Sequence, residues 1–368
     1  MSFSVTEIIG AASLATWIYL LFGRGGFWRV REQPAPASSG ISKPVAVVIP
    51  ARNEEAFIGQ AVASLLHQDY PGHIHIFVVD DHSSDATASA AGVHERLTVV
   101  QAGPLPKGWT GKLWAISEGL RHALALSPGF ILLTDADIVH APDNVAGLAT
   151  RAEAGNLDLT SYMVKLRCQT FPERALIPAF VYFFFQLYPP SWSMSAAGGC
   201  ILVRPDALAR IGGIESIRGE LIDDCALARA IRKDGNIWIG VTQTTRSIRD
   251  YNAFAEIRRM ISRTAFTQLR HSTLLLVATM LGMLVVYAAP ALLIFSDRPG
   301  AVCGFLAWAA MTISYVPTLR FYGRSMAWAP LLPLIALFYI FATVDSAVRY
   351  WTGRGGMWKD RIQNIPSV

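Results

Sequence analysis

Apolar residues follow two patterns along the chain. Apolar runs occupy residues 5–22, 273–296, 301–319 and 328–348, each close to the roughly 20 residues that a helix needs to cross a bilayer. Between the first two runs, short apolar stretches alternate with polar loops. The pattern predicts an N-terminal transmembrane anchor, a folded domain, C-terminal membrane helices and a basic Gly/Trp tail, with bounds at 1–25, 44–270, 271–349 and 350–368.

The folded domain opens with apolar stretches of strand length at residues 45–50, 74–79, 97–100 and 130–134. Apolar positions at helical spacing follow the first stretch, and a further helix is predicted at 113–125. Strand, acidic loop and helix alternate, which is typical of a Rossmann-like parallel α/β sheet. Such sheets bind ligands at the carboxyl ends of their strands, where we expect the chemistry.

Acidic residues mark two of these strand ends. Asp80 and Asp81 follow the second stretch, and Asp135 and Asp137 follow the fourth. The chain turns at a strand end, so both carboxylates of an Asp-x-Asp triplet can reach one cation. Oxygen ligands suit Mg²⁺ or Mn²⁺. Alone, the triplet is weak, because most such triplets are solvated turns.

Two later features complete the set of candidate polar groups. Asp223 and Asp224 precede a short amphipathic helix at 226–231. Arg259 and Arg263 are four residues apart and share one helix face just before the second apolar run. Each feature is weak by itself, but their joint order along the chain is specific.

Composition and charge favour a membrane protein. Only 16% of the 368 residues are charged, and the net charge is +5. We find no basic tract or aromatic RNA-reading motif, so we expect no nucleic acid partner and attribute the charge to lipid headgroups and a pyrophosphate ligand. The cysteines have neither metal-finger nor paired spacing and are expected to be reduced structural thiols: Cys168, Cys200, Cys225 and Cys303.

The flanks of the first apolar run predict the topology. Glu7 lies within the run, and Arg24, Arg29 and Arg31 follow it. A cleavable signal peptide has the opposite order of charge, so an uncleaved anchor fits better. The positive-inside rule then places the folded domain in the cytosol, in an integral protein of the inner (cytoplasmic) membrane.

The motifs resemble those of the family 2 glycosyltransferases, membrane-associated enzymes of GT-A fold that use nucleotide sugars. The matching segments are VIPARNEE at 48–55, VVDDHSSDAT at 78–87, GK at 111–112, TDAD at 134–137, GGC at 198–200 and DDCAL at 223–227. The resemblance covers about residues 45–270 and the membrane arrangement. Within the family, the chain looks most like the hopanoid-associated glycosyltransferases, which are kin of ceramide glucosyltransferase.

The resemblance implies a role for the residues of the first three motifs. Asp81 would accept a hydrogen bond from the uracil ring, and Arg52 and Glu54 would line the nucleotide pocket. Lys112 would touch a phosphate, unless it is an ordinary solvated lysine. Asp80 or Asp81 could instead cap the helix that follows, although Asp85 lies nearer to it.

It also implies roles for the later acids. Asp135 would hold ribose or sugar hydroxyls, and Asp137 would hold the metal that bridges the diphosphate. Asp224 would be the general base that takes the proton of the acceptor hydroxyl, with Asp223 beside it at a position where the family usually has Glu. Either residue could instead cap the helix that follows.

The arginine face departs from the family pattern. Arg259 or Arg263 could bind pyrophosphate, but Met260 stands where Gln or Arg is expected, and Thr264 replaces a Trp. The missing Trp argues against a polymer-making synthase. His82 and His140 lie beside the acidic loops without ligand spacing and are interpreted as ordinary loop residues.

The leading hypothesis is therefore an inverting, metal-dependent glycosyltransferase that moves one sugar from a UDP-sugar to a lipid, with a hopanoid as the favoured acceptor. Ceramide, a carotenoid or a polyprenyl phosphate are alternative acceptors. A catalytically silent membrane scaffold is a different class, which the intact acidic sites disfavour. A transporter ranks last, because it would need ionisable residues inside the spans, and only Asp345, near one end of a span, comes close.

Two membrane features leave alternatives open. The aromatic stretch at 175–195 is either buried core plus loop or an aromatic surface at the bilayer interface. The sequence GRGGxW recurs at 23–28 and 353–358, beside the first and last apolar runs. Both copies on the cytosolic side would require one run not to cross, and we expect 328–348, which contains Pro330 and Pro333, to be re-entrant or interfacial.

Overall fold

The computed structural model describes residues 4–34, 40–358 and 361–362. The chain divides into two compact units. The helical unit contains residues 4–31, 168–192 and 251–355, and the sheet unit contains the described residues of 32–167, 193–250 and 356–362. The predicted folded domain included residues 168–192 and 251–270. In the structure, these two segments belong to the helical unit.

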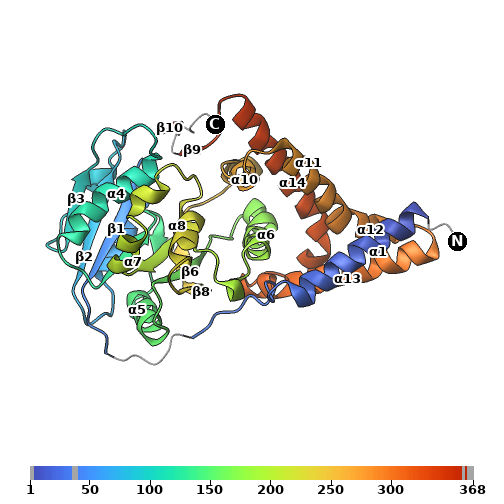
Figure 1. The fold of residues 1–368 in the computed structure, drawn as a ribbon, viewed down its shortest axis with the longest axis horizontal. Helices are drawn as coiled ribbons and strands as arrows, with labels where there is room; N and C mark the ends of the chain where they lie inside the picture. Colours follow the sequence, from blue (N-terminus) through green and yellow to red (C-terminus); the bar gives the residue numbers. More distant parts are fainter. Residues whose placement is uncertain (1–3, 35–39, 359–360, 363–368) are drawn as a thin grey trace. The chain divides into compact units, whose positions relative to one another are not determined.

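The sheet unit is built on eight strands in the order β3-β2-β1-β4-β7-β6-β8-β5 (Figure 1). Their bounds are β1 Val45–Ala51, β2 Ile74–Asp80, β3 Leu97–Gln101, β4 Phe130–Thr134, β5 Ile138–Val139, β6 Leu159–Lys165, β7 Cys200–Val203 and β8 Ile237–Ser247. The four strands predicted from the sequence are all present, and β4 has the predicted bounds.

The prediction of a parallel sheet is right for one half of it. Strands β3, β2, β1 and β4 are mutually parallel. Strand β7 runs antiparallel to β4 and β6, and β5 runs antiparallel to β8, so the sheet as a whole is mixed. The chain reaches β7 after the long excursion through 168–192, not through the short helical crossover that makes neighbouring strands parallel.

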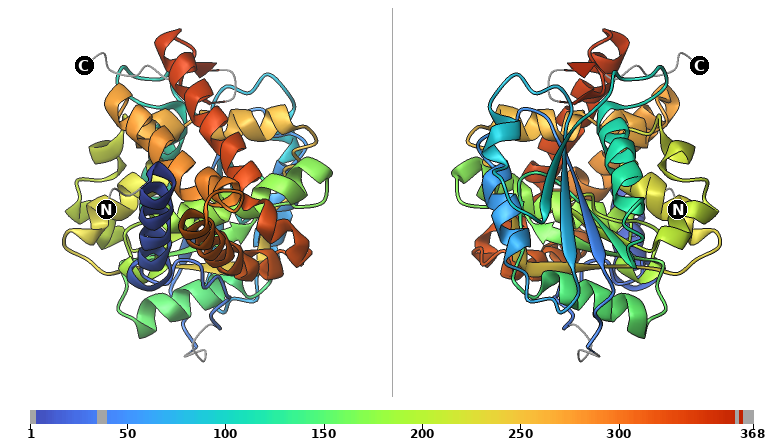
Figure 2. Two further views of the ribbon diagram at one scale, coloured as in Figure 1. Left: turned by 90° about the vertical axis from the view of Figure 1, so that its right-hand side faces the viewer. Right: turned by 90° about the vertical axis from the view of Figure 1, so that its left-hand side faces the viewer.

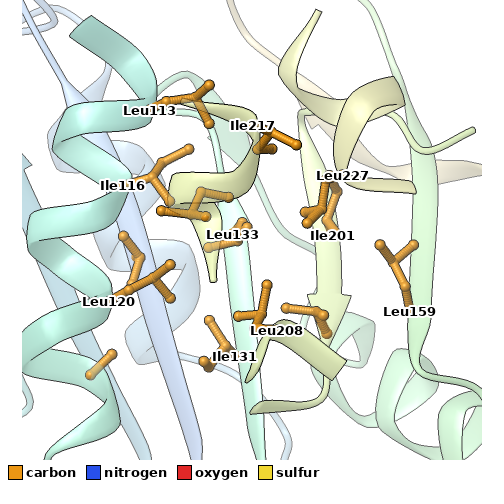
Figure 3. Packing of buried hydrophobic residues seen from close by; sticks show 14 of the residues in the cluster. Leu113, Ile116, Leu120, Ile131, Leu133, Leu159, Ile201, Leu208, Ile217 and Leu227 are labelled. Atoms are coloured by element: carbon orange, nitrogen blue, oxygen red, sulfur yellow. The ribbon is translucent and has the colours of Figure 1, made fainter. Parts of the chain in front are cut away.

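Helices cover both faces of the sheet (Figure 2). They are α2 Ile58–Leu66, α3 Thr87–Ala90, α4 Gly111–Leu124, α5 Asn144–Ala154, α7 Pro205–Arg210 and α8 Asp223–Arg232. One core lies between the sheet and α4, α7 and α8 (Figure 3), and the other contains side chains of α2 and α5. Alternate residues of β1 point into different cores, Ala46 and Val48 into the first and Val47 and Ile49 into the second.

This layering explains both the apolar runs and the acids that end them. All residues of β1 and β4 are buried, as expected for strands covered on both faces. The carboxyl ends of β1, β2 and β4 lie at one edge because these strands are parallel. The first residue of β7, Cys200, pairs with Thr134, which brings the preceding Gly198 and Gly199 to the same edge.

The helical unit contains the apolar runs. Its elements are α1 Val5–Ile18, α6 Phe171–Leu187, α9 Phe254–Ser262, α10 Ala265–Gln268, α11 Thr273–Met283, α12 Ala289–Leu293, α13 Arg298–Phe321 and α14 Leu332–Trp351, with short π- or 3₁₀-helical turns between some of them. In the part of the chain that the structure describes, four continuous helices are long and apolar enough to cross a membrane: Val5–Gly23, Thr273–Leu293, Arg298–Phe321 and Met326–Trp351.

The last of these is not broken by its prolines. Pro330 lies in the 3₁₀ turn Met326–Leu331, and Pro333 lies in the first turn of α14, where a missing backbone N–H leaves no intrahelical partner unpaired. The length and composition of Met326–Trp351 permit a crossing. Its re-entrant or interfacial placement stays a prediction.

The aromatic stretch is mostly helix α6, and its central side chains are core. Tyr182 and Phe185 are buried, and the Tyr182 hydroxyl shares a 2.7 Å hydrogen bond with Ser314 of α13. The Phe183 ring packs against Tyr339 with ring centroids 4.7 Å apart. Within the helical unit the structure thus favours buried core plus loop for 175–195.

Candidate active site

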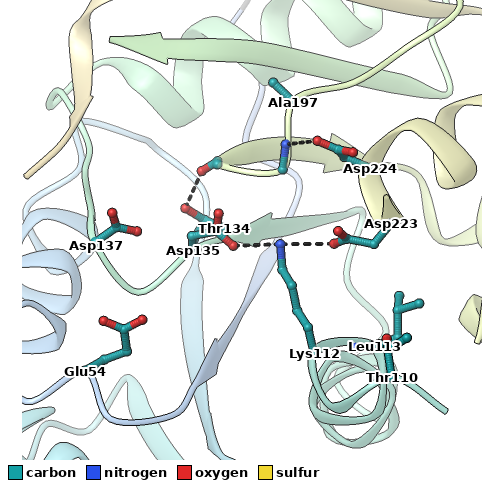
Figure 4. A network of polar contacts seen from close by, with 12 residues as sticks. Glu54, Thr110, Lys112, Leu113, Thr134, Asp135, Asp137, Ala197, Asp223 and Asp224 are labelled. Atoms are coloured by element: carbon teal, nitrogen blue, oxygen red, sulfur yellow. Dashed lines mark hydrogen bonds and ion pairs between the residues drawn. The ribbon is translucent and has the colours of Figure 1, made fainter. Parts of the chain in front are cut away.

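Lys112 joins two acidic motifs at the edge of the sheet (Figure 4). It is the second residue of α4, whose N-cap Thr110 accepts a hydrogen bond from the Leu113 amide. Its ammonium lies 2.9 Å from Asp135 Oδ1 and 3.0 Å from Asp223 Oδ2. Lys112 is therefore not an ordinary solvated lysine, because its partners hold it in the centre of the predicted site.

Asp224 lies beside this pair and is held by the backbone. Its Oδ2 accepts a 2.8 Å hydrogen bond from the Gly198 amide, and its Oδ1 accepts a 2.7 Å bond from the Cys225 amide. Helix α8 begins at Asp223, and its N-cap residue Ile222 makes no side-chain cap. Both acids thus belong to the first turn, where negative charge is favourable, and neither is the N-cap.

Gly198 leaves room for this arrangement. A Cβ atom there would lie 3.3 Å from Lys112 Nζ and 3.4 Å from Asp224 Oδ2, so any side chain would press on both groups. A cavity of about 10 Å³, roughly the room that one water needs, is lined by Gly198, Lys112, Asp135, Asp223 and Asp224. The polar groups of three separate motifs therefore converge on one point.

Burial and mutual repulsion change the acidity of this cluster. Burial and the charge of Asp223 raise the pKa of Asp224 to about 6, although Lys112 opposes the shift. Burial also raises the pKa of Asp135, against the effect of Lys112. The neighbouring carboxylates outweigh burial and raise the pKa of Lys112, which stays charged. A carboxylate that titrates near neutral pH is suited to accept a proton in catalysis.

Asp137 contacts a different cation from its neighbour Asp135. Its Oδ2 accepts a 2.7 Å hydrogen bond from the Ser247 hydroxyl and lies 3.2 Å from Arg249 Nε. The Arg249 Nη2 atom lies 2.7 and 2.6 Å from the two oxygens of Glu54. The structure therefore joins Asp137 to Glu54 through Arg249 and divides the two acids of the triplet between two cations.

A metal at this site would need ligands from a substrate or from water in addition to the protein. The described residues contain no group of three His, Cys, Asp or Glu side chains that could hold an ion. Both contacts of Asp137 use Oδ2, so its Oδ1 is the oxygen that could take a cation. One carboxylate oxygen completed by phosphate oxygens is an ordinary arrangement for Mg²⁺.

The predicted uracil end consists of two loops tied together. Arg52 Nη1 donates hydrogen bonds to the carbonyls of Asp81 and His82, and the Asp81 amide donates to Ala51 O. Asp81 is fully buried. Asp85 accepts a 3.0 Å hydrogen bond from the Thr87 amide at the start of α3, but the N-cap position of this helix is Ala86, so Asp85 is not the N-cap residue.

Comparison with known proteins identifies this part of the chain. Residues 46–212 match the family described as glycosyl transferase family 2. The chain carries a family 2 glycosyltransferase domain. Its fold also resembles a mannosyltransferase from Pyrobaculum calidifontis, solved with GDP-Man and Mn²⁺, with a TM-score of 0.59 and 20% identity over 93% of this chain and 99% of that one. The predicted GT-A fold is thereby confirmed.

Curated relatives match a smaller part of the chain. The 4,4'-diaponeurosporenoate glycosyltransferase of Staphylococcus aureus strain MRSA252 is 31% identical over 130 residues, which cover 34% of this chain and 33% of that protein. In strain USA300, the enzyme of that name is 33% identical over 96 residues, or 26% and 24% of the two chains. The chain thus spans a third or less of the length of these relatives.

Sequence reasoning missed two residues of the sheet unit. Arg249 follows a strand without any motif that would single it out. His140, interpreted as an ordinary loop residue, is buried, with Nε2 3.0 Å from the Thr134 hydroxyl and Nδ1 3.0 Å from Asn144 Nδ2. Burial lowers the pKa of His140 to about 3, so it is neutral and supports the strand end before Asp135.

The predicted arginine face belongs to the helical unit. Arg259 lies in α9, and Arg263 is its C-cap residue. The preceding Arg258 has its Nε 3.8 Å from Asp345 Oδ2, and Arg349 has its Nε 2.8 Å from the same atom. The charge of Asp345 is thus neutralised by basic neighbours. This disfavours a role for Asp345 in carrying ions through a transporter. Pyrophosphate binding by Arg259 or Arg263 stays a prediction.

Proposed function

We propose that this protein transfers a single sugar from a UDP-sugar to a hydroxyl group of a hydrophobic lipid, with inversion at the anomeric carbon. The observation that supports it most is Asp224, a half-buried carboxylate with a pKa of about 6 beside Lys112 and Asp135. An acid with this pKa is largely ionised at neutral pH and is available to take the acceptor proton.

The proposed reaction needs no protein nucleophile. Asp224 removes the proton of the acceptor hydroxyl as its oxygen attacks the anomeric carbon from the face opposite the departing UDP. The Gly198 amide, 2.8 Å from Asp224 Oδ2, and the Cys225 amide, 2.7 Å from Oδ1, orient the carboxylate for this step. Lys112 keeps Asp223 and Asp135 in place.

The donor is proposed to lie along the same strand ends. Asp81, Arg52 and Glu54 form the nucleotide end, and Asp135 holds the ribose or sugar hydroxyls. Asp137 would hold Mg²⁺ or Mn²⁺, which neutralises charge on the leaving diphosphate when it is bound. Arg259 or Arg263 would supply further positive charge to the pyrophosphate.

A lipid acceptor agrees with the apolar helices. Four of them are long enough to cross a bilayer, which supports an integral membrane protein. The proposed location in the inner membrane, with the glycosyltransferase domain in the cytosol, rests on the basic residues that follow the first apolar run. We favour a hopanoid acceptor from the family resemblance. A carotenoid is the second candidate, because the curated relatives are named for transfer to diaponeurosporenoate.

The experiment is a transfer assay with the full-length protein in detergent. UDP-sugars are offered one at a time with hopanoid, carotenoid, ceramide and polyprenyl phosphate acceptors, and products are identified by mass. We expect one sugar per lipid and release of UDP, with no product from an Asp224→Asn control. Failure to consume any nucleotide sugar would favour a silent scaffold.

A further inference from the structure

Arg249 lies between two carboxylates to which the sequence assigns separate roles. Its Nη2 contacts Glu54 at 2.7 and 2.6 Å, its Nε lies 3.2 Å from Asp137 Oδ2, and its guanidinium carbon lies 4.8 Å from the centre of the Phe57 ring. The same Asp137 is the proposed metal ligand. A protein cation therefore already occupies one side of the carboxylate that a metal would use.

The backbone fixes this arrangement. Ser247 at the end of β8 pairs with Ile138, the residue after Asp137, and the Ile248 amide donates a 2.9 Å hydrogen bond to Asp137 O. The Glu54 amide is tied to Thr87 Oγ1 at 2.7 Å. The carboxylates of Glu54 and Asp137 are only 8% and 11% exposed. Arg249 is thus part of a built, largely buried contact and not a free surface side chain.

The charges of the group decide what it can bind. Two carboxylates and one guanidinium leave a formal charge of −1. A divalent cation on Asp137 Oδ1 would lie close to the guanidinium, and two cations at short range repel each other strongly where water is scarce. A diphosphate supplies the missing negative charge, and a planar guanidinium matches phosphate oxygens well.

Building on the proposed function, we propose that Arg249 is an internal cation that competes with the divalent metal for Asp137, so that the metal binds tightly only together with the nucleotide diphosphate. The donor-free enzyme keeps the pair Arg249–Asp137. When UDP and the metal arrive together, the guanidinium turns from Asp137 toward the phosphates and remains bound to Glu54.

The test measures Mn²⁺ binding to the full-length protein, with and without UDP, by electron paramagnetic resonance of the free ion. The main variant is the double substitution E54Q/R249Q, which removes one negative and one positive charge and so keeps the local charge at −1. Arg246→Gln is the matched control, because Arg246 lies exposed near the end of β8, three residues before Arg249.

For the wild type and Arg246→Gln, we expect UDP to tighten Mn²⁺ binding by at least about tenfold, a modest effect for two close charges. For E54Q/R249Q, we expect Mn²⁺ alone to bind at least about tenfold tighter than in the wild type, because Asp137 is no longer shared. Thermal unfolding establishes that each variant is folded. Arg249→Gln alone is the second variant and should change the affinity in the same direction.

Unchanged or weaker Mn²⁺ binding in both variants would overturn the proposal. Adding Asp137→Asn to the double variant should abolish the gain, and a gain that survives would show that Arg249 does not compete at Asp137. If UDP tightens Mn²⁺ binding to the wild-type protein but no sugar is transferred in the assay, the proposed function is contradicted. The proposed competition between Arg249 and the metal would still stand.

Discussion

Two cationic side chains, Lys112 and Arg249, lie among carboxylates at one edge of the sheet. The two cations differ in how many carboxylates they contact and in the shape of the charged group. The Lys112 ammonium bridges Asp135 and Asp223, with Asp224 adjacent, so three acids share one positive charge. The Arg249 guanidinium bridges Glu54 and Asp137, so two acids share one. An ammonium is a compact point charge, whereas a guanidinium is a planar fork suited to oxyanions.

The difference separates two kinds of chemistry within one site. The excess of negative charge around Lys112, added to burial, keeps the pKa of Asp224 near 6, where a carboxylate can gain and lose a proton. The group around Arg249 is closer to neutral and can exchange one cation or anion for another. We therefore propose that the first group transfers the proton and that the second binds the diphosphate and the metal.

The largest expected effect comes from the acid in the Lys112 group. Asp224→Asn should lower turnover at least about 10²-fold, the lower scale for loss of a general base, while UDP-sugar affinity stays near that of the wild type. Steady-state rates and calorimetry with a UDP-sugar measure the two quantities. Loss of affinity together with turnover would make Asp224 a binding residue and would remove the contrast between the two groups.

The Arg249 group should show the opposite pattern. Asp137→Ala should weaken UDP binding in the presence of Mn²⁺ by about tenfold or more, on the scale of disturbed metal sites. Without metal, the variant should bind UDP at least as tightly as the wild type, because Arg249 is no longer paired with Asp137, and this measurement serves as the control. Calorimetry with and without Mn²⁺ checks this, and equal affinities in both conditions would place the metal elsewhere.

The sequence predicted the elements of the site better than their contacts. The apolar run 130–134 ends in Asp135 because a buried strand admits no charge, so the strand and the position of the acid followed from one pattern. Contacts between distant segments carry no such local signal. Neither the approach of Arg249 to Asp137 nor the buried network of His140 could be found without knowing how β7 and β8 pair in the sheet.

The direction of β7 shows the same limit. Residues 198–203 indicate a flexible turn and a strand, but the strand's neighbours depend on a chain path through the helical unit. The sheet was therefore predicted as parallel, although Cys200 pairs antiparallel with Thr134. That pairing brings Gly198 to Asp224, which completes the proposed base.

A smaller effect should follow from removing the cation of the first group. Lys112 lowers the pKa of Asp224, so Lys112→Met should raise that pKa further above about 6. The acid limb of the pH–rate profile should move to higher pH. Below the new pKa, the rate should be about tenfold lower than that of the wild type for each unit by which the pKa rises. Lys107→Met, which removes an exposed charge five residues earlier, is the control and should leave the profile unchanged. An unchanged pH–rate profile for Lys112→Met would mean that Lys112 does not lower the pKa of Asp224.

The smallest effect concerns stability. The pKa of Asp224 is about 6 in the folded protein and about 3.9 for an unfolded carboxyl. The protonated Asp224 side chain therefore contributes its full stabilisation to the folded protein below about pH 4, and this stabilisation is lost as the pH rises through about 6. The Asp224→Asn variant has no titratable group at this position. The Tm of the variant minus the Tm of the wild type should therefore be a few degrees larger at pH 8 than at pH 5. Asp206→Asn, on the exposed start of α7, should show no such difference, and scanning calorimetry at both pH values measures it. Equal Tm differences at the two pH values would mean that burial and Asp223 do not raise the pKa of Asp224.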